Sequence, residues 1–364
     1  MIPKRTKRIT AEWLNDALHH SGYLKDINIK SITREPWGAG EGFVSDMARL
    51  TITYDKNNSE APETMIVKMP TTFRTALAVA LQYNLYEKEN RFYTEIAPIS
   101  PIRVPGLIYQ DYDIESKKSI LILEDCSCYT QVDQIEGLNQ EQTELVIDKI
   151  ADFHIKWWDS PGIYSYDWIP KPRDEISNML IKTYQNDWDI SIKNEEFKQF
   201  LPEGGQKAGE NIYKNYPWLV NDIPDENITL VHFDFRVDNL FFDMNDKENP
   251  LIVFDWGSLS ANGGILDIAY LLAQSLPIDL RRKIEQDMVK RYVKRVEKSG
   301  ITTVDFDLIW EFYLRSLMCY AYIPVLGFAQ LDRSDPRAMR LFEVITKRQF
   351  TAILDNDATN VCPS

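Results

Sequence analysis

The sequence predicts an α+β protein with a smaller, strand-containing first part and a larger, mainly helical second part. Residues 48–54 alternate apolar and polar side chains, as a half-buried strand does, and residues 65–69 and 120–123 are apolar runs of strand length. From residue 144 onward, apolar residues recur at helical spacing instead. With 364 residues the chain is long enough for two domains or for one domain with two lobes.

The composition disfavours a nucleic-acid partner and a membrane span. Apolar residues make up 44% of the chain and charged residues 26%, which is ordinary for a globular domain. The net charge of −14 disfavours nucleic acid, because neutralising phosphates requires a basic face. The few, scattered cysteines suit a reducing compartment, and the basic N-terminus lacks the apolar run of a signal peptide. We therefore expect a cytoplasmic protein with no membrane segment and no obligate protein partner.

The first elements are a helix and strands around a glycine cluster. Thr10 is a typical N-cap for an amphipathic helix over residues 11–20, and residues 27–33 are a strand candidate. A glycine-rich turn lets backbone N–H groups approach phosphate oxygens without side-chain clashes. Because many hairpins turn on glycine, the cluster alone is weak evidence. Its members are Gly38, Gly40 and Gly42.

A lysine interrupts the strand over residues 65–69. This residue, Lys68, stands in an apolar run, and a buried lysine is costly unless it is paired. Residues 73–96 have helical periodicity, and Glu89 is the acid that interrupts their apolar stripe. Glu89 is therefore the candidate partner of Lys68.

Three features of the second part are interpreted as structural. A helix over residues 144–158 carries His154 on its apolar face, where a satisfied core histidine is expected. Asp267 precedes a helix over residues 268–276 and is placed to stabilise its N-terminus. The aromatic residues of segment 308–328 either line an apolar substrate pocket or fill the core, and the core is the commoner place for them.

The candidate catalytic side chains are concentrated in residues 231–257. Asp234 and Asn239 share a short loop that follows the apolar run 228–231, and Asp255 ends a second apolar run. The segment between the runs is a turn by composition, so we expect the runs to pair as a hairpin that places Asp255 beside the Asp234 loop. Phosphoryl transfer needs such a set. One carboxylate must orient the attacking hydroxyl and accept its proton, while an amide and another carboxylate hold Mg²⁺ on the phosphates.

The same residues follow a known pattern in order and spacing. The protein-kinase signature H-R-D-L-x-x-x-N followed by D-F-G is matched by H-F-D-F-R-V-D-N at 232–239 and D-W-G at 255–257. The sequence resembles the kinase-like phosphotransferase superfamily. Within it, the chain is most similar to the aminoglycoside phosphotransferase and choline kinase-like enzymes, including the ecdysteroid kinase-like branch. The resemblance implies a bilobal protein-kinase-like fold, with a nucleotide-binding lobe containing an antiparallel sheet over 1–125 and a catalytic, substrate-binding lobe over 126–364.

The resemblance also implies a role for each candidate. Asp234 would accept the proton of the substrate hydroxyl or orient it. Arg236 would stabilise charge on the transferring phosphoryl group, unless it pairs with Asp238 and holds the loop. Lys68, held by Glu89, would grip the phosphates of ATP or GTP. The other expected nucleotide contacts are Gly40, Gly42, Glu124 and Cys126, and the expected Mg²⁺ ligands are Asn239 and Asp255.

Further residues are expected to support these groups. His232 would brace the loop by hydrogen bonds, and an aspartate at the place of Asp267 ties down the catalytic-loop backbone in the kinases that the chain resembles. The run Glu89-Asn-Arg-Phe-Tyr matches the family's helix that carries the glutamate partner of the lysine.

Two other functions are weighed against that of a small-molecule kinase. A protein kinase needs a long activation segment closed by A-P-E, but only residues 258–266 separate Gly257 from Asp267, and the string Ala61-Pro62-Glu63 lies ahead of the strand lysine. A nucleotide-binding regulatory pseudokinase without turnover would usually have lost one of the main functional residues. All of them are present: Lys68, Asp234, Asn239 and Asp255.

The acceptor is expected to be a hydroxylated small molecule, and the sequence leaves its class open. Phe233 and Arg236 depart from the ecdysteroid-like pattern, which has Gly after the loop histidine and Trp two residues after the aspartate, and look more like aminoglycoside-type enzymes. The Glu-x-x-Phe-Tyr helix and the Leu-Glu-Asp hinge point back to the ecdysteroid-like branch. An aminoglycoside would need an acidic pocket, and a sterol or macrolide an apolar one.

Overall fold

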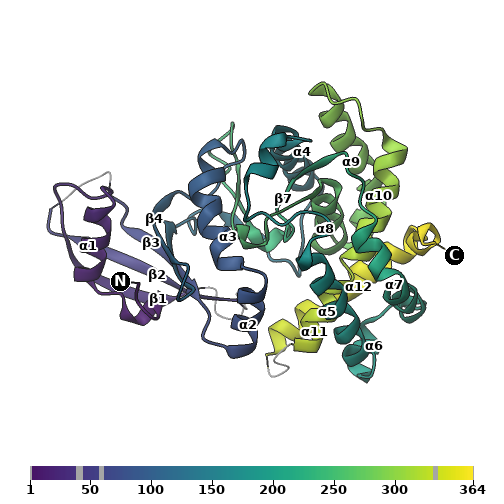
Figure 1. The fold of residues 1–364 in the computed structure, drawn as a ribbon, viewed down its shortest axis with the longest axis horizontal. Coiled ribbons are helices and arrows are strands. Elements are labelled where there is room, and N and C mark those ends of the chain that lie inside the picture. Colours follow the sequence, from purple (N-terminus) through teal and green to yellow (C-terminus); the bar gives the residue numbers. More distant parts are fainter. Residues whose placement is uncertain (1, 38–43, 57–60, 331–334, 364) are drawn as a thin grey trace. The chain divides into compact units, whose positions relative to one another are not determined.

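The computed structural model describes residues 2–37, 44–56, 61–330 and 335–363. The chain forms two compact units, whose elements are labelled in Figure 1. Unit 1 comprises Met1–Thr130, Asp243–Asn245 and Ile252–Ser258, and unit 2 comprises Gln131–Phe242, Asp246–Leu251 and Leu259–Ser364. Two short segments of the second half of the chain, including the D-W-G motif, therefore belong to unit 1.

Unit 1 is built on a five-stranded antiparallel sheet of order β1-β2-β3-β5-β4. The strands expected from the sequence are confirmed, with small shifts at their ends. Lys68 lies in the middle of the sheet, opposite Met47 on one side and Leu121 on the other. The strands are β1 (Ile29–Pro36), β2 (Ser45–Tyr54), β3 (Thr64–Pro70), β4 (Leu107–Asp113) and β5 (Lys118–Glu124).

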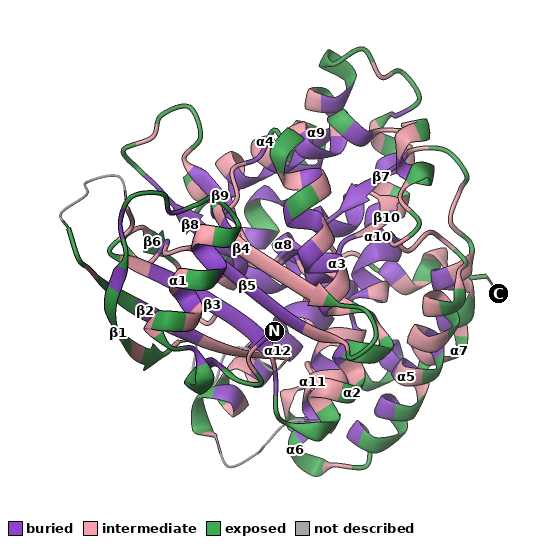
Figure 2. Ribbon diagram, turned by 60° about the vertical axis from the view of Figure 1, so that its left-hand side comes forward, coloured by how far each residue is buried: buried purple, intermediate pink, exposed green. Residues whose placement is uncertain are grey.

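The core of unit 1 lies between this sheet and helix α1 (Ala11–His20), which follows a short 3-10 turn, η1 (Thr6–Arg8). The predicted cap is present, because Thr10 Oγ1 accepts the backbone N–H of Trp13 at 3.1 Å. Leu14 and Leu18 are fully buried against the sheet. Figure 2 shows that β3 and β5 are buried along most of their length, as their apolar sequences require.

The prediction of a single helix over residues 73–96 is wrong in detail, because the segment is divided into several shorter helices. Asn84 has a left-handed φ of 51°, a conformation that asparagine tolerates better than most residues, and it separates the first two helices. The pieces are α2 (Arg74–Gln82), α3 (Leu85–Arg91), a π-helical turn η2 (Phe92–Ile96) and a 3-10 turn η3 (Ala97–Ile99). The break leaves Glu89 on a short helix of its own.

Unit 2 is mainly helical, and α8 (Ile265–Ser275) is buried along its whole length (Figure 2). Its sequence is mostly apolar, which is typical of a central core helix. The expected helix over 144–158 starts earlier, where Asn139 and Gln142 form a capping box. The other helices are α4 (Gln140–Trp157), α5 (Glu175–Ser191), α6 (Glu195–Phe200), α7 (Gly205–Asn221), α9 (Ile278–Lys298), α10 (Phe306–Cys319), α11 (Tyr322–Gln330) and α12 (Pro336–Asp355). The shorter turns of unit 2 are η4 (Pro161–Ser165), η5 (Val237–Asn239) and η7 (Ala358–Val361), whereas η6 (Trp256–Ser258) belongs to unit 1.

The prediction that residues 228–231 and 252–255 pair as a hairpin is wrong. Strand β7 (Ile228–Val231) pairs antiparallel with β10 (Ser260–Gly263). Strand β9 (Leu251–Val253) belongs to a separate sheet of order β6-β8-β9, with β6 (Thr130–Gln131) and β8 (Leu240–Phe242). The second apolar run stops being a strand at Val253, because Asp255 adopts a left-handed φ of 63° and the chain turns through η6 before it reaches β10.

One segment has the length and composition of a helix that could cross a membrane. Among the described residues, this segment is Phe306–Ala329, with a mean hydropathy of 1.2. In the structure it forms α10 and α11, which pack on α8 and α5, and 56% of the apolar window is buried. Packing within unit 2 therefore accounts for its apolar character.

Candidate functional site

The candidate residues fall into two groups, each within one compact unit. Unit 1 holds Lys68, Glu89, Glu124, Cys126 and Asp255, and unit 2 holds Asp234, Arg236 and Asn239. The glycines Gly40 and Gly42 lie outside the described residues. The functional roles assigned to the two lobes stay predictions.

Lys68 lies between two carboxylates of unit 1. Its Nζ is 2.7 Å from Glu89 Oε1 and 2.7 Å from Asp255 Oδ1. The side chains of Lys68 and Glu89 are almost completely buried, whereas that of Asp255 is 32% exposed. The Lys68–Glu89 ion pair expected from the sequence is therefore present, and Asp255 joins it. Two negative charges surround one positive charge.

The carboxylates keep this lysine charged. Burial alone would lower the pKa of Lys68, but Asp255 and Glu89 more than offset burial and raise that pKa above its ordinary value. Burial raises the pKa of Glu89, and the ammonium of Lys68 opposes the rise. A charged ammonium attracts an anionic phosphate, and the excess carboxylate attracts a cation on the side where Asp255 is exposed.

The D-W-G segment is fixed against α3 and η2. The indole of Trp256 is fully buried and stacks on Phe92, with ring centroids 4.2 Å apart and an interplanar angle of 7°. A Cβ at Gly257 would lie 3.1 Å from the carbonyl oxygen of Leu85, so the close approach favours glycine. These contacts hold the neighbouring Asp255 in its left-handed conformation, which is costly for a residue other than glycine.

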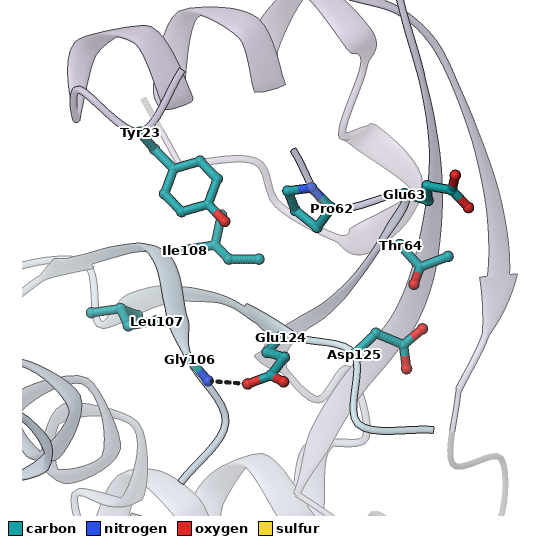
Figure 3. Close-up of a pocket in the computed structure, with 9 residues that line it drawn as sticks. All are labelled: Tyr23, Pro62, Glu63, Thr64, Gly106, Leu107, Ile108, Glu124 and Asp125. Atoms are coloured by element: carbon teal, nitrogen blue, oxygen red, sulfur yellow. Dashed lines mark hydrogen bonds between the residues drawn. The ribbon is translucent and has the colours of Figure 1, made fainter. Parts of the chain in front are cut away.

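The expected hinge residues, Glu124 and Cys126, lie in unit 1, where Glu124 is hydrogen bonded to Gly106. The N–H of Glu124 donates to the carbonyl of Gly106 at 2.8 Å, and the N–H of Gly106 donates to the Glu124 carboxylate at 3.0 Å (Figure 3). Burial raises the pKa of the Cys126 thiol, so this side chain is neutral. Glu124 lines a pocket of about 440 Å³ with Tyr23 and Asp125 among its other walls (Figure 3). Contact of either hinge residue with a nucleotide stays a prediction.

Asp267 holds the backbone at the start of the catalytic loop in unit 2. Its carboxylate accepts the N–H of His232 at 2.8 Å and that of Phe233 at 2.9 Å. His154 Nε2 lies 3.2 Å from the same carboxylate, and His154 Nδ1 lies 3.0 Å from the hydroxyl of Tyr292. Two predictions are confirmed: His154 is a satisfied core residue, and Asp267 ties down the loop. The expected position of Asp267 ahead of its helix is wrong, because α8 begins at Ile265 and Asp267 lies in its first turn.

The loop itself places Asp234. The backbone N–H of Asp234 donates to His232 Nδ1 at 3.3 Å, which is the brace expected from His232. Asn239 Nδ2 donates to the Asp234 carbonyl oxygen at 2.8 Å and to Asp234 Oδ2 at 3.1 Å. Burial and the charge of Asp234 raise the pKa of the nearby Tyr270 hydroxyl. The side chain is held from several directions yet remains 27% exposed, so a substrate hydroxyl can reach it.

Arg236 holds the loop in this structure. Its Nη1 donates to Asp238 Oδ2 at 2.8 Å and to Gln134 Oε1 at 3.0 Å, and its Nε lies 3.5 Å from Asp234 Oδ1. The backbone N–H of Gln134 donates to Asp238 Oδ1 at 3.0 Å, so these side chains form one network. This is the loop-holding alternative expected from the sequence. Contact between Arg236 and a phosphoryl group stays a prediction.

The expected Mg²⁺ ligands, Asn239 and Asp255, offer oxygen atoms of the kind that Mg²⁺ prefers. In the part of the chain that the structure describes, no group of three or more His, Cys, Asp or Glu residues is arranged to hold a metal ion. Mg²⁺ is usually held by one or two carboxylates together with substrate phosphates and water. A sparse set of oxygen donors therefore fits an ion that is carried by a nucleotide.

Sequence reasoning missed the residues that fix the loop from outside it. Gln134 contacts two loop side chains, and Tyr320 donates its hydroxyl to the carbonyl oxygen of Phe233 at 3.0 Å. No spacing pattern reveals these partners, because they come from distant segments. The one available signal was on α8, where Asp267 and Tyr270 are polar residues three apart, and so on one face, in an otherwise apolar helix.

Solved structures of phosphotransferases are similar in fold to this chain. A mutant of aminoglycoside 2′-phosphotransferase-IIIa in complex with GDP matches with a TM-score of 0.55 and 13% identity, over 94% of this chain and 98% of that one. Ethanolamine kinase of Plasmodium vivax matches with a TM-score of 0.52 and 11% identity, over 93% of this chain and 85% of that one. At these identities the likeness shows the fold, and the predicted bilobal protein-kinase-like α+β fold is confirmed.

Curated proteins and the model of one protein family also match parts of this chain. Acyl-CoA dehydrogenase family member 10 of Mus musculus is 35% identical over 127 residues, which is 31% of this chain and 11% of that protein. The chain spans about a tenth of the length of the curated relatives it matches. Residues 39–300, well over half of the chain, match the model of the ecdysteroid kinase-like family. The chain belongs to the ecdysteroid kinase-like family.

Proposed function

We propose that the protein is a phosphotransferase that moves the γ-phosphate of ATP or GTP to a hydroxyl group of a small molecule, with Mg²⁺ as cofactor. The observation that carries this proposal is the charged Lys68 between Glu89 and Asp255. A buried ion cluster contributes little to stability compared with apolar residues of similar size. It is, however, the arrangement that kinases use to grip nucleotide phosphates.

The loop of unit 2 supplies the groups for the acceptor. Asp234 accepts the proton of the attacking hydroxyl or orients that hydroxyl toward the phosphorus. Asn239 fixes the Asp234 carboxylate through its amide nitrogen, which leaves its amide oxygen as the atom that would bind the cation. Asp255 would bind the same nucleotide-borne cation, and bound Mg²⁺ would neutralise phosphate charge.

Aromatic rings lie beside the proposed base. Phe233, the residue before Asp234, is partly exposed, and its ring centroid is 5.8 Å from that of Tyr320 and 6.4 Å from that of Tyr322. Tyr322 is partly exposed as well. Aromatic faces favour flat apolar groups through burial and dispersion.

The charges next to the base do not select the acceptor. Arg236 lies 3.5 Å from the Asp234 carboxylate and is paired with Asp238, so its positive charge is offset, and the aromatic rings are the selecting feature. We therefore assign an uncharged alcohol with an apolar ring body as the acceptor, in preference to a polycationic aminosugar. The assignment is our choice between the acceptor classes that the sequence leaves open.

Replacing Tyr322 by alanine is expected to raise the KM for the acceptor by roughly 10-fold, since one ring contact is lost. The kcat and the KM for the nucleotide should stay unchanged, because the proposal assigns Tyr322 to the body of the acceptor and not to the transfer step. Tyr164→Ala is the matched control, as Tyr164 is 64% exposed in the same unit. An acceptor KM that moves no more in Tyr322→Ala than in the control would reject the assigned acceptor surface.

The direct test of the function is release of nucleoside diphosphate from Mg-ATP and Mg-GTP. The acceptors would be polycyclic alcohols, aminoglycosides, choline, ethanolamine, sugars and a generic protein substrate. We expect acceptor-dependent release with uncharged ring alcohols, and loss of that release in EDTA. If Mg-nucleotide raises the melting temperature but no acceptor stimulates release, the protein is a nucleotide-binding regulator. If the nucleotide has no effect at all, the proposed function is wrong.

A further inference from the structure

Tyr320 fixes the peptide that precedes the proposed base. The residue follows α10 and is 1% exposed, and its hydroxyl donates to the Phe233 carbonyl oxygen at 3.0 Å. The N–H of Phe233 is bound on its other side by Asp267 at 2.9 Å. Phe233 has a left-handed φ of 69°, which is unfavourable for an aromatic residue and persists only where surrounding contacts impose it. The backbone that leads into Asp234 is therefore clamped from both sides.

Tyr270 packs against Tyr320. It lies on α8 and is 1% exposed. Its ring stacks on that of Tyr320, with centroids 4.5 Å apart and an interplanar angle of 20°. Burial, together with the charge of Asp234, raises the pKa of Tyr270 well above its ordinary value, so the hydroxyl stays neutral. The stack fixes the ring of Tyr320, because movement of either ring would displace the other.

The alternative is that Tyr320 has a purely structural role, since buried tyrosines also fill the core elsewhere in unit 2. Tyr216, for example, is fully buried, stacks on Tyr184 with centroids 4.0 Å apart, and donates to the carbonyl oxygen of Cys319 at 3.0 Å. The difference lies in where the hydroxyl group ends. The hydroxyl of Tyr320 ends on the peptide that precedes Asp234 in the catalytic loop.

We propose that Tyr320 is a positioning residue for Asp234, because it holds the backbone that leads into the base. The proposal rests on the proposed function, in which Asp234 must meet the acceptor hydroxyl in one geometry. Tyr270 supports Tyr320 by stacking on its ring.

The experiment compares Tyr320→Phe with Tyr216→Phe. Each change removes one buried hydroxyl and keeps the stacked ring, and both tyrosines bind a backbone carbonyl at 3.0 Å. We expect Tyr320→Phe to lose roughly 10-fold in kcat, since a small misplacement of a catalytic group is costly. Its acceptor KM and nucleotide affinity should stay unchanged. The Tyr216→Phe variant should keep its kcat even if its melting temperature falls as far.

Hydrogen exchange of the backbone amides in residues 232–239 is the second readout, and it needs no acceptor. Exchange should be faster in Tyr320→Phe than in wild type and unchanged in Tyr216→Phe. If wild type turns over and Tyr320→Phe matches the Tyr216 control in kcat, the positioning role is refuted while the proposed function stands. If wild type turns over no acceptor, the proposed function fails, and unchanged loop exchange in Tyr320→Phe would refute the positioning role separately.

Discussion

Replacing Asp234 by asparagine is expected to lower kcat by roughly 100-fold or more, because the amide cannot accept the proton of the acceptor hydroxyl. The fold of the loop should survive. Its backbone is held by Asp267, His232 and Tyr320 through contacts that do not involve the Asp234 side chain. Affinity for Mg-nucleotide should stay unchanged, since the proposed phosphate grip is Lys68. Steady-state kinetics and calorimetric titration with nucleotide measure the two quantities.

The matched control is Asp246→Asn, an identical loss of charge in the same unit. Asp246 accepts the backbone N–H groups of Glu248 and Asn249 in a turn, at 3.0 and 2.9 Å. Its variant should have the kcat of wild type. Near-normal turnover in Asp234→Asn would show that the catalytic loop has been assigned wrongly.

Replacing Lys68 by methionine is expected to abolish detectable binding of Mg-nucleotide and to destabilise the protein by about 3 to 5 kcal/mol, because removing one member of a buried ion cluster leaves uncompensated charge. Two carboxylates, Glu89 and Asp255, would then face each other without the ammonium that lies 2.7 Å from each. Denaturant unfolding reports the free energy of unfolding, and calorimetry reports nucleotide binding.

Lys198→Met is the control for this second prediction. Lys198 also lies 2.8 Å from a carboxylate, that of Glu195, but both side chains are well exposed, and an exposed pair contributes little to stability. A Lys68→Met protein that is as stable as this control and still binds Mg-nucleotide would contradict the proposed role of the lysine cluster.

The sequence predicts most of the sheet and much of the candidate site, because both leave local signals. The strand around Lys68 is an apolar run, and Glu89 interrupts an apolar helical stripe, so each residue is recognisable within its own segment. The order of Asp234, Asn239 and Asp255 is likewise a short-range pattern. The roles of these residues stay predictions until the variants are measured.

The remaining features depend on partners that are distant in the chain. The break at Asn84 results from a left-handed residue inside a helical pattern. Strand β7 pairs with β10 and not with the apolar run that ends at Val253, since the chain turns at Asp255. Tyr320 reaches Phe233 across 87 residues of sequence, and no periodicity encodes such a contact.

The most direct test of phosphoryl transfer to a small molecule follows the γ-phosphoryl group itself. Wild-type protein would be incubated with Mg-ATP or Mg-GTP labelled with ¹⁸O in the γ-phosphate and with the acceptor that best stimulates diphosphate release, and the products analysed by mass spectrometry. We expect the label to appear in a phosphomonoester of the acceptor, and we expect this product to be strongly reduced in Asp234→Asn. Label recovered only in inorganic phosphate or in unreacted nucleotide would contradict transfer to a small-molecule hydroxyl.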